Sequence, residues 1–568
     1  NHSTALGATN AALWVSYQNL PVPILFVCED NGLGISVSTP KEWIANRWST
    51  QPGLSYFRAD GLDLGTTYDI ATQAIQYCRS ERAPTFLHLD VVRLLGHAGT
   101  DVELAYRDIS EIKEGESRDP LFLNTRRAIV LGLATGAELN TLYEEVRNRV
   151  HRASQRAARH PRLAGAEEII QPLAPYSAAK VRGEAERDDY EDARIAHFGT
   201  ATKLPESNKP RPLAQLLNWG LHDLLSKYPE MLVFGEDVGK RGGVYGVTAQ
   251  LYEKSSAGRV FNTLLDEQSI LGMAIGAGQL GFLPVPEIQY LAYYHNAEDQ
   301  IRGEASTLQF FSKGQLRNPM VIRIASWGYQ RGFGGHFHND NSIAALRDVP
   351  GVVIASPSRG EDAVGMLRTA LALAHVDGRI VFFLEPIALY RTRDLLSEKD
   401  GAWLDSFPPP GSAVELGRAR VYKEFANGNP QLTIVSWANG LWRSLRAAHV
   451  LKEQHGIGSR IIDLRWLLPV DIKTICDEAL KTGRVLIVDE GRKTGGVSEA
   501  LVAEFMETYP ETSDGLLPRI VRYCGDDTFI PLGPSWEHVL PSEDGIVQRA
   551  IDLVENPSIS SEGYRQRE

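Results

Sequence analysis

The chain has 568 residues, 43% of them hydrophobic and 23% charged, a composition typical of a globular enzyme with several domains. Its formal net charge of −12 disfavours binding to nucleic acid or to an anionic membrane, because either partner attracts a basic surface. No apolar run in the sequence reaches the roughly 20 residues that cross a bilayer.

Four cysteines are spread along the chain without metal-ligand spacing: Cys28, Cys78, Cys476 and Cys524. This usage predicts a reducing, cytoplasmic setting. Residue 1 is Asn, and residues 1–14 have the pattern of a helix interior rather than of a signal peptide. We therefore expect further sequence before Asn1.

The first region, residues 1–162, alternates apolar strands with helical patterns. A buried strand is expected at residues 23–28 and another strand at 85–92, with a helix at 67–78 between them. This order predicts a βαβ unit, and hence a parallel sheet covered by helices. A long, charged amphipathic helix is expected at residues 138–159.

The following residues, 163–212, are rich in charges, Pro and Ala and predict an exposed linker. A second α/β domain is expected at 213–410 and a third at 411–556, before a tail at 557–568. The expected strands are 231–234, 284–289, 320–325, 352–355, 380–384, 432–435, 459–464, 485–489 and 520–523. The expected helices of the third domain are 441–455 and 471–482.

Residues 276–281 (GAGQLG) fit the G-x-G-x-x-G pattern of dinucleotide-binding proteins. That pattern requires a preceding strand and a helix that begins at the glycines. Here residues 269–275 predict a helix before the glycines, and the strand comes after them. We therefore interpret these glycines as allowing close helix packing, and we expect no NAD site.

Residues 29–34 (EDNGLG) follow the first expected strand. Ligands of open α/β sheets bind beyond the carboxyl ends of the strands. The side-chain oxygen of Asn31 suits Mg²⁺, which prefers oxygen ligands and shares them with phosphates, and glycines let a backbone carbonyl approach the same ion. An ordinary turn is the alternative interpretation.

Residues 28–36 (CEDNGLGIS), with residues 1–14 and the strand between, resemble the second half of the thiamine-diphosphate motif of 2-oxo acid dehydrogenase alpha subunits. The resemblance implies that Asn31 supplies a side-chain ligand and Leu33 a backbone carbonyl to Mg²⁺, with Gly32 in the cofactor site. The Gly-Asp that opens the motif would precede residue 1. Because its Asp is a metal ligand, the chain as given is expected to bind Mg²⁺ poorly or not at all.

Residues 93–101 (RLLGHAGTD), followed by Tyr106 and Arg107, resemble the active-site loop of the same family. By this resemblance His97 helps to hold the cofactor diphosphate and orders the loop; a surface histidine is the alternative. Some relatives carry a regulatory serine directly after this histidine. Ala98 stands there in this chain, so control by phosphorylation at that position is not expected.

The second half of the chain resembles the beta subunit of the same family. Five segments carry this likeness: 234–239 (FGEDVG), 262–268 (NTLLDEQ), 286–290 (PEIQY), 337–342 (FHNDNS) and 356–358 (SPS). Two later segments, 462–465 (IDLR) and 488–491 (VDEG), resemble the transketolase C-terminal domain. The resemblance implies an α/β fold with transketolase-like, thiamine-diphosphate-binding domains, parallel sheets covered by helices, and fused alpha and beta halves.

By this resemblance Glu267 is the carboxyl group that binds N1′ of the cofactor's aminopyrimidine. That hydrogen bond favours the imino tautomer, whose 4′-imino group removes the thiazolium C2 proton, so the protein sets tautomer and geometry while the cofactor performs the chemistry. This role favours apolar neighbours, because they raise the pKa of the carboxyl group. The candidate neighbours are Leu264, Leu265, Ile270, Leu271 and Met273. The alternative for Glu267 is a helix N-terminal Glu favoured by the helix dipole.

Tyr293 corresponds to the aromatic residue that stacks on the aminopyrimidine. Its neighbours Tyr290 and Tyr294 leave the assignment open, and packing in the core is an alternative. Glu236 resembles an acidic position near the cofactor.

His338 corresponds to the beta-subunit histidine that acts as acid or base on the substrate and on the incoming lipoyl disulfide. His336 is close enough in sequence to share this role, and a solvated loop histidine is the alternative. The glycines before it predict unusual backbone angles: Gly332, Gly334 and Gly335.

The implied reaction is oxidative decarboxylation of a 2-oxo acid, followed by reductive acylation of the lipoyl group of a dihydrolipoyl transacylase. The fused architecture and residues 287–290 (EIQY) favour branched-chain substrates, with pyruvate next. We expect a homodimer of fused chains, with thiamine diphosphate and Mg²⁺ between the first domain of one copy and the second domain of another copy or half.

Two rival interpretations remain. A transketolase or deoxyxylulose-phosphate synthase shares the three-domain plan but transfers carbon units to aldehydes; the helix at 138–159 favours the dehydrogenase. A catalytically silent scaffold is the other rival, and the presence of Glu267, His338 and Asn31 argues against it.

Overall fold

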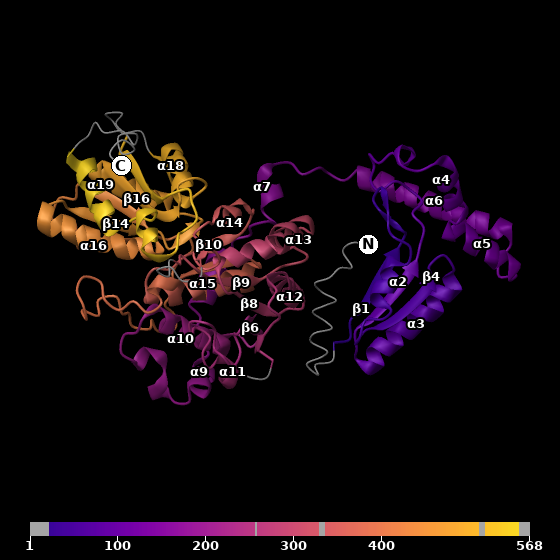
Figure 1. The fold of residues 1–568 in the computed structure, drawn as a ribbon, viewed down its shortest axis with the longest axis horizontal. Helices are drawn as coiled ribbons and strands as arrows, with labels where there is room; N and C mark the ends of the chain where they lie inside the picture. The colour runs from indigo at the N-terminus through magenta and orange to yellow at the C-terminus, as the bar shows by residue number, and fades with distance from the viewer. Residues whose placement is uncertain (1–21, 256–257, 329–334, 510–516, 556–568) are drawn as a thin grey trace. The chain divides into compact units, whose positions relative to one another are not determined.

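The computed structural model describes residues 22–255, 258–328, 335–509 and 517–555, so the expected helix at residues 1–14 and the tail at 557–568 lie outside the described residues. The chain divides into two compact units, Asn1–Leu163 (unit 1) and Ala164–Glu568 (unit 2). Among the described residues no helix is both long and apolar enough to span a bilayer. Figure 1 labels many of the helices and strands, which are numbered in chain order.

Unit 1 contains a parallel three-stranded sheet in the order β1-β5-β4. The expected βαβ unit is confirmed: β1 (Leu25–Asp30) and β5 (Thr85–Asp90) are strands, and α3 (Leu64–Glu81) precedes β5. The sequence did not predict β4 (Ser55–Asp60), which pairs with β5. The expectation of a buried first strand is wrong for the described residues. Only Cys28 of β1 is buried, because β1 is an edge strand.

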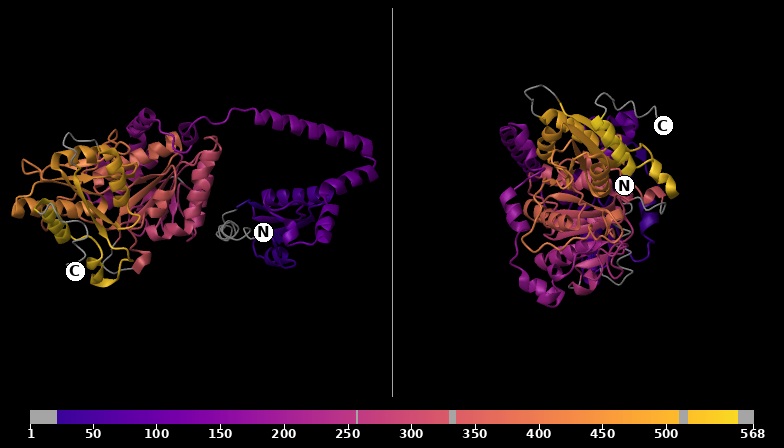
Figure 2. Two further views of the ribbon diagram at one scale, coloured as in Figure 1. Left: turned by 90° about the horizontal axis from the view of Figure 1, so that it is seen from above. Right: turned by 90° about the vertical axis from the view of Figure 1, so that its left-hand side faces the viewer.

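The other α-helices described in unit 1 are α2 (Trp43–Trp48), α4 (Ile109–Ser117), α5 (Pro120–Val130) and α6 (Gly136–Ala158). The long helix expected at 138–159 is confirmed as α6, which Figure 2 shows as one continuous helix. It begins with a capping box, in which Thr135 and Glu138 each bond the other's backbone N–H.

Unit 2 contains two sheets, the larger of which has seven strands in the order β15-β10-β11-β9-β8-β6-β7. Its strands are β6 (Met231–Gly235), β7 (Val260–Asn262), β8 (Leu283–Ile288), β9 (Met320–Ser326), β10 (Val353–Ala355), β11 (Ile380–Pro386) and β15 (Trp466–Leu468). The pairs are parallel except that β15 runs antiparallel to β10. The five strands expected here are confirmed to within two residues at their ends, and β15 shows that the third region supplies a strand to this sheet.

Both faces of this sheet are covered by helices, as expected of a parallel sheet. Alternate residues of β9 divide between two hydrophobic clusters, with Val321 in one and Ile322 in the other. The cluster of Val321 contains the buried faces of α10 (Leu213–Lys227) and α15 (Gly360–Asp377). The cluster of Ile322 contains the buried face of α12 (Glu267–Gln279), which carries the candidate catalytic carboxyl group.

The smaller sheet has five strands in the order β12-β14-β13-β16-β17, with only β12 antiparallel to its neighbour. Its strands are β12 (Arg420–Tyr422), β13 (Leu432–Ser436), β14 (Ser459–Asp463), β16 (Arg484–Arg492) and β17 (Arg519–Gly525). The helices of this region are α16 (Ala438–His455), α17 (Ile472–Thr482), α18 (Val497–Thr508) and α19 (Glu543–Glu555). The four strands and two helices expected here are confirmed.

The prediction that residues 163–212 form an exposed linker is wrong for most of that segment. Residues 164–208, which we call the strap, contain α8 (Ala178–Ala185) and α9 (Glu191–Phe198) and belong to unit 2. The strap looks polar because most of its residues are exposed and its few buried residues are spaced apart. One of these is charged: Arg194 is 2% exposed and pairs with the buried Asp223 of α10. A charge paired in this way can be buried without an apolar sequence signal.

The helix expected at residues 269–275, ahead of the last glycine, and the strand expected after the glycines are both confirmed. Gly276 and Gly278 lie in the last turns of α12, and β8 follows them rather than preceding them. Gly281 has a φ of +87°, so it ends the helix rather than beginning one.

We expect Asp223→Ala to lower the free energy of unfolding of unit 2 by about 3–5 kcal/mol, because it leaves buried cations without a counter-charge. The Asp223 carboxylate accepts bonds from Arg194, Arg368 and the Tyr190 hydroxyl and is itself fully buried. Urea unfolding measures the effect. Glu398→Ala, at the exposed Glu398–Lys399 pair, is the control and should change stability by less than about 0.5 kcal/mol. A loss below about 1 kcal/mol for Asp223→Ala would contradict the role of this cluster.

Candidate active site

Glu267 is the first residue of α12, and its side chain lines a cavity of about 580 Å³. The preceding Asp266 caps the helix by accepting the backbone N–H of Ser269. Glu267 is 7% exposed, and its Oε2 accepts a hydrogen bond from Asn296 Nδ2 at 3.3 Å. The carboxyl group is therefore nearly enclosed but still borders the cavity. Glu267 is therefore placed where its carboxyl group can bind a ligand in the cavity.

The apolar surroundings expected for Glu267 are only partly present. Ile270 and Leu271 are fully buried, but they belong to the core under α12. Leu265 is 81% exposed and Met273 is 39% exposed. Leu265 precedes α12, and Met273 lies on the face of α12 that turns away from the core.

Three tyrosines follow β8, and they differ in where they lie. Tyr294 is fully buried, and Tyr290 is 4% exposed. Tyr293, in the helical turn η5 (Leu291–Ala297), is half-buried and lines the same cavity as Glu267. Of the three, Tyr293 therefore offers its ring to the cavity of Glu267.

His338 lines a second cavity, of about 440 Å³. The two cavities adjoin, because Glu236, Leu265 and Gln289 line both of them. The His338 ring lies edge-on to Tyr290, with ring centres 4.3 Å apart. His336 lines neither cavity; its ring is exposed beside Phe337. Among the loop glycines Gly335 has a φ of +60°, whereas Gly332 and Gly334 lie outside the described residues.

Glu236 directly follows β6 and stands between the two cavities. Its Oε1 atom is buried and has no hydrogen-bond partner. Burial, together with the nearby carboxylate of Glu267, raises the pKa of Glu236 to about 7. A carboxyl group in this state can hold or release a proton near neutral pH.

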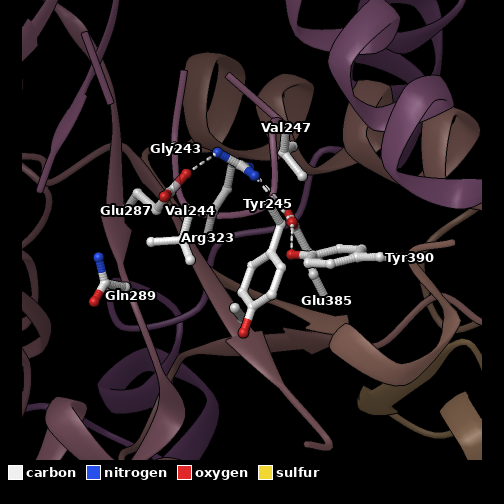
Figure 3. Close-up of a pocket in the computed structure, with 10 residues that line it drawn as sticks. Gly243, Val244, Tyr245, Val247, Glu287, Gln289, Arg323, Glu385 and Tyr390 are labelled. Carbon is white, nitrogen blue, oxygen red and sulfur yellow. Dashed lines mark hydrogen bonds and ion pairs between the residues drawn. The ribbon is translucent and has the colours of Figure 1, made fainter. Parts of the chain in front are cut away.

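A buried ionic network lines a small pocket that shares Val244, Tyr245 and Gln289 with the second cavity (Figure 3). The guanidinium of Arg323 is 2% exposed, bonds both carboxylate oxygens of Glu385 and donates to Glu287 at 2.6 Å. The Tyr390 hydroxyl donates to Glu385 at 2.6 Å. Burial raises the pKa of Glu287. The network joins β8, β9 and β11 beneath Gln289, so it fixes the strand ends from which the site is built.

In unit 1, Asn31 stands directly after β1, at the carboxyl edge of the parallel sheet. Its side-chain oxygen accepts the backbone N–H of Leu33 at 3.0 Å, and the N–H of Gly32 bonds Asp30. Leu33 pairs with Ser38 in the short hairpin that follows.

His97 lies exposed in a loop that a dense network holds in shape. Its backbone N–H donates to Asp101, and the Asp101 carboxylate also accepts the Tyr106 hydroxyl, each at 2.7 Å. Arg93 contacts Tyr106 and donates to the carbonyl of Ile35 at 2.6 Å. The network therefore places the His97 loop against the hairpin that follows Asn31. Arg93, Asp101 and Tyr106 all belong to the segment whose sequence resembles the active-site loop, but the bonds by which they order it are visible only in the structure.

The residues around the two cavities of unit 2 fit the aminopyrimidine end of thiamine diphosphate. The fit rests on the buried, unpartnered Glu236 Oε1, the carboxyl of Glu267 and the half-buried ring of Tyr293. The fit is less complete for Mg²⁺. Within the described ranges no group of three or more His, Cys, Asp or Glu side chains could hold a metal ion.

The sequence reasoning missed two residues that contribute to this site. Asn296 bonds Glu267, and Arg241 lines the cavity of His338. Neither stands in a motif that the resemblance marks. Asn296 reaches Glu267 only because η5 packs beside α12, a tertiary contact that no local pattern encodes.

Three family models match successive parts of the chain. Residues 1–165 match "Dehydrogenase E1 component", residues 211–392 match "Transketolase, pyrimidine binding domain", and residues 422–546 match "Transketolase, C-terminal domain". The mitochondrial 2-oxoisovalerate dehydrogenase subunit beta of Dictyostelium discoideum is 35% identical over 320 residues, which are 56% of this chain and 80% of that protein.

The chain belongs to the 2-oxo acid dehydrogenase E1 family. The pyruvate dehydrogenase E1 component subunit beta of Staphylococcus epidermidis is 32% identical over 348 residues, 60% of this E1 chain and 98% of that protein. The corresponding Bacillus subtilis subunit is 31% identical with the same coverage. A solved structure titled "Split gene transketolase, inactive beta4 tetramer" has a TM-score of 0.47 and 21% identity, covering 61% of this chain and 100% of that chain. The E1 family depends on thiamine diphosphate.

We expect Glu236 to make this E1 chain less stable as pH rises from about 4.5 to 7. The folded-state pKa of about 7 lies above the ordinary value of 4.5, so the folded chain binds more protons in that window. The loss should level off above pH 7. Glu236→Gln should remove the part of the fall in melting temperature with pH that Glu236 causes. Melting temperatures of both proteins from pH 5 to 8 test this, and parallel curves would contradict it.

Proposed function

We propose that this chain catalyses the oxidative decarboxylation of a 2-oxo acid and transfers the acyl group to the lipoyl group of a dihydrolipoyl transacylase. The observation that carries the proposal is that Glu267, Tyr293 and His338 line two adjoining cavities at the carboxyl edge of the seven-stranded sheet. The sequence relatives act as supporting evidence, since they are beta subunits of 2-oxoisovalerate and pyruvate dehydrogenases.

Glu267 would bind the pyrimidine nitrogen of thiamine diphosphate and exchange a proton with it. Its Oε2 is held by Asn296, which leaves the other oxygen for the cofactor. Tyr293 would place its ring against the pyrimidine. When bound, the cofactor supplies the nucleophilic carbon and accepts the electrons that remain when CO₂ leaves. Glu236 would keep a proton beside this ring, since its pKa is raised to about 7.

His338 would move a proton to or from the substrate and then the lipoyl disulfide, from a position beside Tyr290. Asn31, Gly32 and Leu33 would hold the diphosphate end, with Asn31 and Leu33 as ligands of Mg²⁺. His97 would contact the diphosphate from its ordered loop. These roles extend over both units of the chain.

The proposal includes a homodimer of fused chains, in which thiamine diphosphate lies between the first domain of one copy and the second domain of another copy or half. The proposed domains are 1–162, 213–410 and 411–556. A cytoplasmic location is supported by the four free cysteines, none of which is in a disulfide.

Glu267→Gln should reduce 2-oxo acid decarboxylation by at least about 100-fold, because an amide cannot exchange a proton with the pyrimidine nitrogen. The amide oxygen can still accept the bond from Asn296, so the fold should be retained. Steady-state assays of the complete gene product measure the effect. Glu253→Gln, at an exposed position of α11 (Leu251–Lys254), is the control and should retain activity. Near-normal turnover by Glu267→Gln would contradict the proposal.

Substrate preference is tested with 3-methyl-2-oxobutanoate and pyruvate side by side. We expect the higher kcat/KM with the branched acid, at equal lipoyl-domain concentration. A higher kcat/KM with pyruvate would assign the chain to pyruvate oxidation. Acceptance of a sugar phosphate in place of the lipoyl domain would contradict the proposed acyl transfer.

A further inference from the structure

The cavity of His338 contains one permanently cationic side chain, the guanidinium of Arg241. Arg241 lies in the loop after β6 and is followed by two consecutive glycines with positive φ, Gly242 and Gly243. Arg241 Nη1 donates a hydrogen bond to the carboxylate of Asp237 at 2.5 Å. A guanidinium has five N–H donors, so this single bond leaves others for a ligand.

Asn262 supplies a second donor to the same cavity. It is the last residue of β7, and its Oδ1 accepts the backbone N–H of Gly239 at 2.7 Å. Because that oxygen must face the N–H, the Nδ2 donor has to point the other way. The contact is close: a Cβ on Gly239 would lie 3.0 Å from Asn262 Oδ1, so a glycine at 239 lets the loop approach and fixes the amide.

A 2-oxo acid is an anion at neutral pH, and its carboxylate can leave water only if donors or a cation receive it. Two acidic residues share the cavity. Asp237 already pairs with Arg241, which keeps further N–H donors for a ligand, and the raised pKa of Glu236 keeps much of that group protonated near neutral pH. The guanidinium fork matches a carboxylate in shape and charge.

We propose that Arg241 and Asn262 bind the carboxylate of the 2-oxo acid and so select anionic substrates for the cavity of His338. This inference rests on the proposed function, since it names the substrate anchor of the same site. Both donors and His338 line one cavity, so a substrate held by its carboxylate would present its keto group within that cavity. Arg241 and Asn262 act in binding, and neither has a part in proton transfer.

The test is steady-state kinetics of the complete gene product with thiamine diphosphate, using 3-methyl-2-oxobutanoate and pyruvate. Arg241→Gln should raise KM about 10- to 100-fold with kcat little changed, because a charge-assisted bond formed in both ground and transition states is lost. Arg241→Lys should have a KM between those of the wild type and Arg241→Gln, since lysine keeps the charge but not the forked geometry of the guanidinium.

Asn262→Asp gives an independent readout. Aspartate can still accept the Gly239 N–H, so the melting temperature and thiamine-diphosphate affinity should match the wild type. It replaces the donor with a negative charge, so KM should rise at least as much as in Arg241→Gln. Arg147→Gln is the matched control, because Arg147 is an exposed arginine of α6 in an ion pair with Glu144. It should leave KM unchanged.

A KM within about twofold of the wild type in both Arg241→Gln and Asn262→Asp would overturn the inference while leaving the proposed function intact. A fall in kcat with unchanged KM would overturn it as well, since it would assign these residues to the chemical step. Failure of the wild-type protein to decarboxylate either acid would overturn the proposed function together with the inference. The two failures are therefore distinguishable.

Discussion

The position of the Glu267 carboxyl group depends on how α12 starts. The chain leaves β7, Asp266 caps the helix, and Glu267 is the first helical residue. Ile270 and Leu271, within one turn, are fully buried in the core below the sheet. Rotation of the helix would expose these side chains, at a cost of about 1.5–3 kcal/mol for each. Hydrophobic packing therefore holds a polar group at the cavity wall.

Next to the cavity of His338 the chain buries a network of charged side chains. Arg323 is enclosed by Glu287 and Glu385, two carboxyl groups against one guanidinium. Such a network is costly to desolvate and contributes little net stability. It does, however, join three adjacent strands near the edge of the sheet, where Gln289 and the three tyrosines follow the end of β8. We interpret it as fixing the cavity wall rather than as stabilising the fold.

Much of unit 2 could be predicted from its sequence, because strands buried on both faces are continuous apolar runs. Strand β4 was missed because its sequence, SYFRAD, lacks such a run. The strap was missed because most of its residues are exposed, and its few buried side chains, Arg194 among them, form no apolar run. Strand β15 was missed because it joins a sheet from a distant part of the chain.

The site residues likewise divide into those that a sequence motif marks and those that only the three-dimensional fold brings to the site. Glu267, Tyr293, His338 and Glu236 were found because they stand in motifs that resemble a family, and the structure brings them to two adjoining cavities. Arg241 and Asn296 were not found, because loop path and packing between elements bring them there. Their roles could be inferred only from three-dimensional neighbours. Asn31 and His97 lie in unit 1, each in an ordered loop.

The most direct test of the account is an experimental structure of the complete gene product with thiamine diphosphate and Mg²⁺ bound. The account predicts the aminopyrimidine N1′ within hydrogen-bond reach of the Glu267 carboxyl, about 2.6–3.2 Å, with the Tyr293 ring against the pyrimidine. A cofactor bound elsewhere, with Glu267 facing only solvent or protein, would contradict it.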